Sequence, residues 1–453
     1  MMKRSRGRRV LVAVALLGTI APGAARAQMH GAMPTAEQMA LLDTLGTIPD
    51  VTKPPPGIDY VLWKELVPPD NQMTPERVAL GKKLYFDTRL SKDGSVACAT
   101  CHDVSRGFTD QRPLAEGIGD QLGRRNSPTT LNAPFFQFFF LDGRAPSLEE
   151  QSKLPILNPV EMGQPSPDAA MQAIVADAEY QQLFEQAYGR KPTYEDLGRA
   201  IASFERTLVF LQSPFDRFLM GDNDAISEQA RQGWVLFNGK GRCMSCHQLN
   251  PSDPIGTDNR FHNVGVAARH QDFEDLARKA IKELAGKSGN DRTEAIDRLA
   301  LETNLSELGR FLVTFDRADV GAFKTLQLRN VGVTGPYMHD GSMTTLWDVM
   351  DHYNKGGESN AFLDGGIEPL ALTEPEIDAL VALMFSMTDD RLKADNEKMM
   401  AAQRERANTQ RPFRDEALAM RRTLPFEARA TGAEPAPKVA PTGPTAPGAA
   451  KEG

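Results

Sequence analysis

Cysteine is scarce in this chain of 453 residues, and its four cysteines occupy two short motifs of one form. The motifs are Cys98-Ala99-Thr100-Cys101-His102 and Cys243-Met244-Ser245-Cys246-His247. Beyond residue 27 no run approaches the roughly 20 apolar residues that a transmembrane helix requires, so no membrane span is expected. Histidine is rare as well, with seven in all and none between His102 and His247.

A Cys-x-x-Cys-His motif is typical of covalent c-type haem attachment. Two thiols reach the two vinyl groups of one porphyrin, and the adjacent imidazole reaches its iron. A zinc site or two disulfides would not need a histidine after each second cysteine. A thioredoxin-type redox site would need one motif beside a βαβ pattern, which is not apparent. The two motifs therefore predict two haems, bound through Cys98, Cys101, His102, Cys243, Cys246 and His247.

Residues 1–27 are typical of a cleavable secretory signal, with a basic stretch, a short apolar run and small residues at Ala25 and Ala27. We therefore expect a periplasmic protein, because c-type haem is attached in that compartment. Loss of six positive charges with this segment takes the formal net charge from −8 to −14. Such an acidic chain argues against nucleic acid and anionic membrane surfaces, and is compatible with steering a basic redox partner.

The expected fold is mainly α, with two cytochrome c-like haem domains, little strand, and haems near the domain interface. About 426 residues exceed one ordinary hydrophobic core, so one domain per motif is predicted. Thr74, followed by Pro75, and Ser227 are typical helix caps, so a helix is predicted to begin after each of them and to precede each motif. The run that begins at Gly233 echoes the run that begins at Gly81, which suggests duplicated domains. The predicted segments are an extended Pro-rich arm (28–73), an N-terminal haem domain (74–220), a C-terminal haem domain (221–395), a helical extension (396–426) and a disordered tail (427–453).

The histidine distribution bears on which iron is open. A haem with two protein ligands transfers electrons, whereas a vacant position can bind a small molecule. No histidine of the N-terminal domain can close the far side of the first iron. Met162, Met171 and Met220 could do so, but only Met162 lies in a loop-like setting. We therefore predict an open first haem.

Five further motifs show a resemblance to a known family. They are Arg124-Arg125-Asn126-Ser127-Pro128-Thr129, Asp142-Gly143-Arg144-Ala145, Asn158-Pro159-Val160-Glu161-Met162, Phe261-His262-Asn263-Val264-Gly265 and Pro336-Tyr337-Met338-His339-Asp340-Gly341. In order and content they resemble the bacterial di-haem cytochrome c peroxidases over roughly residues 75–390. The resemblance implies an oxidoreductase that reduces hydrogen peroxide at the N-terminal haem. The implied electron donor is a protein, either a small cytochrome c or a cupredoxin, and a homodimer is compatible with the resemblance.

The resemblance also assigns roles to residues. Glu161 corresponds to the distal acid/base at the peroxide-binding haem, and Gln151 and Pro155 match two other residues of that face. Asn126 and the carbonyl groups of Thr334 and Pro336 match a calcium site between the domains. Oxygen ligands of this kind suit a hard cation.

Tyr353 lies fourteen residues after His339, where typical members of the family carry the methionine ligand of the second haem. Tyrosine there resembles the MauG-like subgroup and implies high-valent iron shared between the haems, because a phenolate favours more oxidised iron than a thioether does. Met338, Met343, Met350 and His352 are close enough in sequence to compete as ligands. An enzyme that oxidises residues of a partner protein, and a pure electron-transfer cytochrome, remain as alternatives to a peroxidase.

Two features depart from the family pattern. Leu141 stands where relatives carry a tryptophan between the haems, so Trp234 is a substitute on the electron path. The segment 267–320 is longer and more helical than expected. Its amphipathic spacing is consistent with a lid or a partner platform, or more simply with packed surface helices.

Overall fold

The computed structural model describes residues 36–46, 50–250, 253–269 and 272–410. The expected signal peptide and the expected disordered tail lie outside these ranges. Within them the fold is mainly α, as predicted, with a single two-stranded sheet. The helices and strands are α1 (Ala36–Leu45), α2 (Tyr60–Leu66), α3 (Pro75–Tyr85), α4 (Cys98–Cys101), α5 (Leu148–Gln151), α6 (Leu154–Leu157), α7 (Pro167–Val175), α8 (Ala178–Tyr188), α9 (Tyr194–Glu205), α10 (Pro214–Leu219), α11 (Glu228–Asn238), β1 (Phe261–His262), α12 (Phe273–Leu284), α13 (Gly289–Glu302), α14 (Phe311–Thr314), β2 (Phe323–Lys324), α15 (Leu346–Asn354), α16 (Glu374–Ser386) and α17 (Lys393–Gln410).

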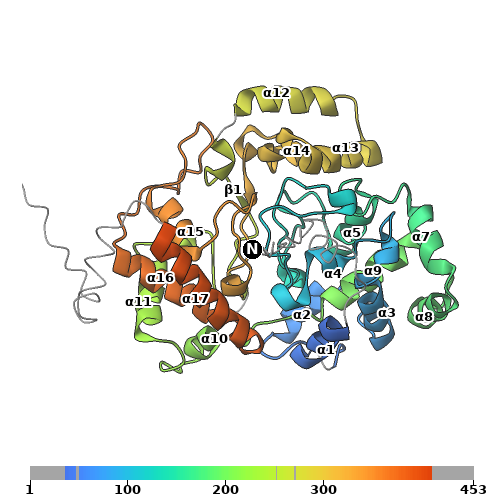
Figure 1. Ribbon diagram of the computed structural model, residues 1–453, viewed down its shortest axis with the longest axis horizontal. Coiled ribbons are helices and arrows are strands. Elements are labelled where there is room, and N and C mark those ends of the chain that lie inside the picture. Colours follow the sequence, from blue (N-terminus) through green and yellow to red (C-terminus); the bar gives the residue numbers. More distant parts are fainter. Residues whose placement is uncertain (1–35, 47–49, 251–252, 270–271, 411–453) are drawn as a thin grey trace, which may run out of the picture.

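Each motif follows a capped helix that packs against a partner helix of its own lobe. Helix α3 begins after Thr74, whose hydroxyl accepts a hydrogen bond from the Arg77 amide, and it packs on α9. Helix α11 begins after Ser227, whose hydroxyl accepts from the Ala230 amide, and it packs on α16. The two helix pairs lie on opposite sides of the molecule in Figure 1. Both predicted helix starts are confirmed.

A glycine permits the close crossing in each pair. A Cβ atom on Gly81 would lie 1.8 Å from the carbonyl oxygen of Ala200, and one on Gly233 would lie 2.1 Å from that of Ala379. Neither distance is possible for real atoms, so only glycine allows these backbones to meet. The short sequence echo between the two runs therefore corresponds to the same crossing in both lobes.

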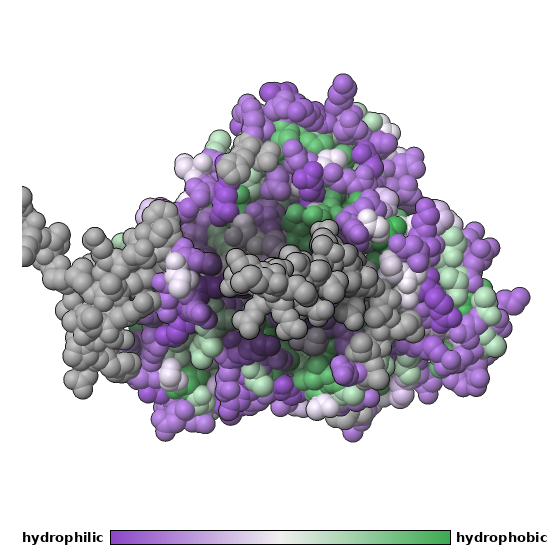
Figure 2. Space-filling view, viewed as in Figure 1, coloured by the Kyte–Doolittle hydropathy of each residue, from purple (hydrophilic) through white to green (hydrophobic). Residues whose placement is uncertain are grey.

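Helices α12, α13 and α14 form a third layer above the lobes (Figure 1). Leu276, Ala280 and Leu284 of α12 pack with Ile296 and Leu299 of α13 in an apolar cluster of their own. Figure 2 shows hydrophobic residues between these helices and around the central hollow, on a mostly hydrophilic face. The described parts of segment 267–320 thus form packed surface helices. Beneath them β1 pairs antiparallel with β2.

The prediction of an extended arm over residues 28–73 is wrong for two segments. Helix α1 buries Leu42 in the core of the first lobe, and α2 buries Trp63. The Asp59 carboxylate caps α2 by accepting hydrogen bonds from the amides of Val61 and Leu62. The many nearby prolines hid these signals, because they break the chain into helices too short to show periodicity.

The helical extension begins earlier than predicted, because α17 starts at Lys393, and its described part ends at Gln410. Gln403 is buried, accepts from the Leu346 amide and donates to the Tyr337 hydroxyl, so α17 is attached to the second lobe. Across the described ranges, no helix combines the length and the hydropathy needed to cross a bilayer.

Candidate active site

Both motifs open onto one cavity of about 430 Å³ that is lined by residues of both lobes. The residues to which the sequence analysis assigned a role in haem binding, catalysis or calcium binding all lie on its wall: Cys98, Cys101, His102, Asn126, Gln151, Pro155, Glu161, Cys243, Cys246, His247, Thr334, Pro336 and Tyr353. The fold therefore brings together residues up to 255 positions apart, counted from Cys98 to Tyr353.

The first motif presents two thiols and a neutral imidazole to this cavity. Cys98 and Cys101 lie one helical turn apart in α4 and form no disulfide. Burial lowers the pKa of His102 to about 4, which keeps its imidazole neutral and able to bind a metal. The Tyr85 hydroxyl donates to the His102 carbonyl at 3.0 Å and fixes the end of the motif. This donor set fits one covalently attached haem.

Glu161 shares the wall with this motif and has an unusual carboxyl group. Its Oε2 atom is buried without a hydrogen-bond partner among the described residues. Burial, reinforced by the charge of Asp297 and partly offset by Arg144, raises the pKa of Glu161 to about 7. A carboxyl with these properties can accept and release a proton near neutral pH.

A compact loop holds Glu161 in place. The Asn158 side-chain oxygen accepts hydrogen bonds from the amides of Val160 and Glu161, at 2.9 and 3.3 Å. The Met162 amide donates to the carbonyl of Pro155 at 3.2 Å, so Pro155 and Glu161 belong to one folded unit. Met162 is buried and also lines the cavity, as the sequence analysis allowed.

The second motif has a well-oriented histidine. His247 Nδ1 donates to the carbonyl oxygen of Gly256 at 2.9 Å, which leaves Nε2 free for a metal. Burial lowers the pKa of His247, so this imidazole is also neutral. Cys243 and Cys246 are free thiols on the same wall. The second donor set therefore fits a second haem of the same kind.

Tyr353 reaches the second half of the cavity from α15. Burial and the nearby Cys246 and Cys243 raise the pKa of its hydroxyl well above the usual range. Among the competing ligands, Met338 and Met350 share this wall, whereas Met343 and His352 do not. His352 instead hydrogen-bonds the Val264 carbonyl through Nε2 at 2.8 Å.

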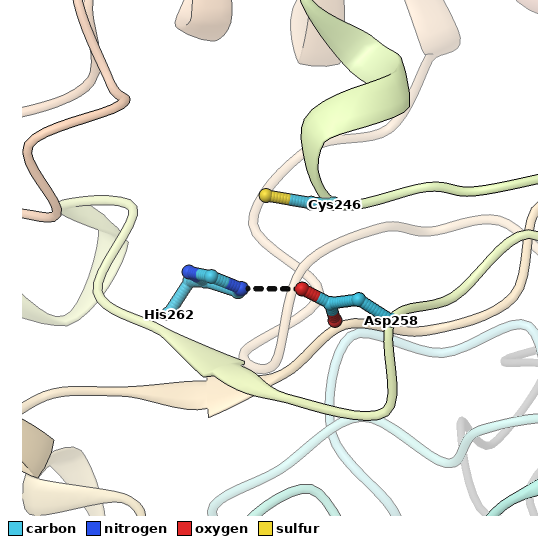
Figure 3. Close-up of side chains that lie close together, drawn as sticks. All are labelled: Cys246, Asp258 and His262. Carbon is cyan, nitrogen blue, oxygen red and sulfur yellow. Dashed lines mark hydrogen bonds and ion pairs between the residues drawn. The ribbon is translucent and has the colours of Figure 1, made fainter.

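Cys246, Asp258 and His262 lie close together beside the second motif (Figure 3). Both ring nitrogens of His262 are engaged, Nε2 with Asp258 at 2.9 Å and Nδ1 with Asp364 at 2.7 Å. Hydrogen bonds to Asp258, Cys246 and Asp364 raise the pKa of His262 to about 11. Both ring nitrogens of His262 therefore face carboxylates rather than the cavity centre. Cys246 belongs to the second Cys-x-x-Cys-His motif, so this group of three side chains is part of the surroundings of that motif.

A buried lysine, Lys324, also lines the cavity. The Lys324 ammonium donates to the Phe138 carbonyl at 2.9 Å and lies 3.9 Å from the ring centroid of Phe136. Burial, partly opposed by Asp142, lowers the pKa of Lys324 to about 7. The Lys324 amide donates to the carbonyl of Leu141, which lines the cavity. Trp234, by contrast, does not line the cavity but stacks on Phe237, which does.

The residues of the expected calcium site also line the cavity. The Asn126 amide donates to the His339 carbonyl at 2.8 Å, which joins the two lobes. The Asn126 side-chain nitrogen donates to the Arg112 carbonyl at 2.7 Å, which orients the side-chain amide. Thr334 and Pro336 lie on the same wall.

Comparison with known proteins bears directly on this site. A family model described as di-haem cytochrome c peroxidase matches residues 75–224. The methylamine utilization protein MauG of Methylorubrum extorquens is 38% identical over 71% of this chain and 80% of its own length. The chain belongs to the di-haem cytochrome c peroxidase family. The cytochrome c551 peroxidase of Nitrosomonas europaea, another relative, is 31% identical over 72% of this chain and 85% of its own.

Solved structures agree with this membership. The crystal structure of a MauG-like protein associated with microbial copper homeostasis has a TM-score of 0.58 and 28% identity, over 72% of this chain and 92% of its own. The di-haem peroxidase BthA of Burkholderia thailandensis shares the fold, with a TM-score of 0.54 and 23% identity over 71% and 88%. Membership makes the protein an oxidoreductase and implies two c-type haems.

Three buried charged residues of the di-haem site were missed from the sequence. They are Glu205 of α9, Asp297 of α13 and Lys324 of β2. Burial, with Glu149 adding and Arg206 opposing, raises the pKa of Glu205 to about 8. Each of the two acids adjoins buried apolar residues of its helix, such as Phe204 and Ile296, and a charged residue in such a position is the signal that could have revealed them.

Proposed function

We propose that this protein is a periplasmic peroxidase that reduces hydrogen peroxide at its N-terminal haem with electrons from a protein donor. One peroxide, two protons and two electrons give two water molecules. The observation that supports this most directly is the Glu161 carboxyl, which has an unpaired oxygen and a pKa near 7 on the wall shared with His102.

Glu161 is the proposed acid/base. Heterolytic cleavage requires one proton to leave one peroxide oxygen and arrive at the departing oxygen. With a pKa of about 7, the Glu161 carboxylate can take the proton at Oε2 and return it near neutral pH. Gln151, at the end of α5, and Pro155, in α6, complete the proposed distal wall and orient the substrate there.

His247 and Tyr353 are the proposed ligands of the second haem. When bound, the haems supply the peroxide-cleaving iron and a second centre that shares the oxidising equivalents. The hydrogen bond to Gly256 fixes the His247 ring for this task. A phenolate oxygen from Tyr353 is a hard ligand and stabilises oxidised iron more than a methionine sulfur would.

A calcium ion is the proposed link between the lobes, with Asn126 and the carbonyl groups of Thr334 and Pro336 as ligands. Oxygen donors of this kind suit a hard cation. Metal analysis of the purified protein tests the site, and we expect one calcium ion per chain. An Asn126→Ala protein that binds as much calcium as the unsubstituted protein would contradict this proposal.

Oxidation of residues in a partner protein is a second candidate function. Tyr353 favours it, because a phenolate-ligated haem retains oxidising equivalents rather than storing an electron. The 38% identity to a MauG protein also favours it. A small cytochrome c or a cupredoxin is the donor proposed for the peroxidase. Rapid peroxide-dependent oxidation of such a donor supports the peroxidase, and a long-lived oxidised state formed without prior reduction supports the second function.

The deciding experiment is the reaction of the di-haem protein with hydrogen peroxide, followed by absorption spectroscopy. We expect a high-spin ferric component that changes on adding peroxide, and a Glu161→Gln protein whose rate is lower by a factor of about 10²–10⁴. Glu185→Gln is the matched control, because Glu185 is exposed on α8. Two low-spin haems that peroxide leaves unchanged would instead support a pure electron-transfer cytochrome.

A further inference from the structure

Helix α13 carries a carboxylate into the interior beside the proposed peroxide site. Asp297 is 7% exposed and follows Ile296 on the buried side of α13. Leu301, from the same helix, reaches the cavity wall. The segment 267–320 therefore contributes to the site rather than only covering it.

Asp297 makes two different contacts with the first lobe. Its Oδ1 atom accepts a hydrogen bond from Arg144 Nε at 2.8 Å. Its Oδ2 atom accepts one from the side-chain nitrogen of Asn158, also at 2.8 Å. The carboxylate thus joins Arg144 and Asn158, which lie 153 and 139 positions before it in the sequence.

Asn158 transmits this contact to Glu161. Its side-chain oxygen already accepts from the amides of Val160 and Glu161. The Asn158 amide group therefore cannot turn over without losing those two bonds. Asp297 fixes Asn158, and Asn158 fixes the backbone that carries the Glu161 carboxyl.

Arg144 provides a second route. Its side chain is 3% exposed, pairs with Asp142 as well as Asp297, and lines the cavity. Among the described residues, the charges that act on Glu161 are Asp297 and Arg144, of opposite sign. The thiols of Cys98 and Cys101 are also near, but haem attachment consumes them.

We infer that Asp297 is a positioning residue for Glu161, which it holds through Asn158 and Arg144, with α12 and α13 as its support. The inference rests on the proposed function of Glu161. A purely stabilising role explains the arrangement less well, because buried ion pairs are often no more stabilising than apolar residues of similar volume. The third layer is thus part of the peroxide site.

The test is the pH dependence of the peroxide reaction in a D297N di-haem protein. An asparagine at position 297 keeps only one acceptor oxygen, so it cannot accept hydrogen bonds from both Arg144 and Asn158, and we expect a several-fold lower rate. Loss of the negative charge leaves Arg144 to act alone, so the pKa of Glu161 falls. The acid limb of the profile should therefore move down by about 1 pH unit.

Two further variants make the result decisive. D291N removes an exposed charge from the same helix, and its limb should match that of the unsubstituted protein. D297E keeps the negative charge but displaces it. The acid limb of its pH–rate profile should therefore lie closer to that of the unsubstituted protein, while its rate falls. If D297N does not accumulate as di-haem protein, D297E decides, with an unchanged rate overturning the inference.

The inference and the proposed function fail separately. Suppose that the acid limb of the pH–rate profile is the same in the D297N protein as in the unsubstituted protein, and that Glu161→Gln abolishes this limb. Only the role of Asp297 is then overturned. A Glu161→Gln protein that reacts as fast as the unsubstituted one overturns the proposed function itself.

Discussion

At the scale of single residues, the ligand of the second haem controls how easily that haem is reduced. Replacing Tyr353 with methionine exchanges a hard phenolate for a soft thioether, which favours ferrous iron. We expect the reduction potential of the second haem to rise by on the order of 100 mV. A spectroelectrochemical titration measures this change.

Met343 offers a matched control for that titration. Met343 is buried and is close to Tyr353 in the sequence, but it does not line the cavity. A Met343→Leu protein should keep its potential. An unchanged potential in Tyr353→Met would instead assign the second iron to Met338 or Met350, which do share the wall.

Glu205 makes stability depend on pH. Burial raises the pKa of Glu205 to about 8 from a usual value of 4.5, so the folded chain resists ionising it. The resulting penalty is absent below about pH 4.5, grows as the pH rises to about 8, and is constant above that. Glu205→Gln should therefore stabilise the protein increasingly over this range, by up to about 5 kcal/mol.

Thermal unfolding at several pH values tests this. Glu185→Gln, an exposed change on α8, should show no such trend. If the gain in stability of the Glu205→Gln protein were the same at pH 5 and pH 9, the expectation would be contradicted, since the effect would then not come from ionisation.

Residue roles could be predicted from the sequence only where they depend on near neighbours. The predicted haem-attachment residues fall within two motifs of five consecutive residues, so each motif can be recognised from the sequence alone. Asp297 and Lys324 act on groups 139 to 186 positions away, and only the fold reveals those contacts. Glu161 was found because a family motif surrounds it.

At the scale of elements, local signals predicted the helices that have caps and long apolar faces. Thr74 and Ser227 marked the starts of α3 and α11 correctly. Helices α1 and α2 were missed because they are short and are stabilised by packing, with Leu42 and Trp63 buried against other elements. Propensity alone rarely supports helices of such length.

The helix crossings depend on single glycines. Gly81→Ala places a Cβ atom against the Ala200 carbonyl, so α3 and α9 must separate. We expect the first lobe to lose about 3 kcal/mol of stability by this overpacking. Denaturant unfolding measures the loss, with Gly365→Ala as the control, because a Cβ there meets nothing within 4 Å. Equal stability of the two variants would show that the crossing tolerates a side chain.

At the scale of the whole molecule, two similar lobes enclose one cavity but differ in chemistry. The first motif shares its wall with the free carboxyl of Glu161, whereas the second shares its wall with Tyr353. The sequence predicted this asymmetry from the histidine distribution and from Tyr353. It did not predict that the third layer reaches the first site, since amphipathic helices usually only cover a surface.

Removing one haem at a time tests this division of work. A C98A/C101A protein should retain the second haem and lose its reaction with peroxide, because the iron beside Glu161 is gone. A C243A/C246A protein should still change its spectrum with peroxide but should fail to oxidise a reduced donor protein. Haem-to-protein ratios and absorption spectra confirm which haem each variant retains. Peroxide reduction by the C98A/C101A protein at the unsubstituted rate would show that the second lobe, and not the first, carries the reaction.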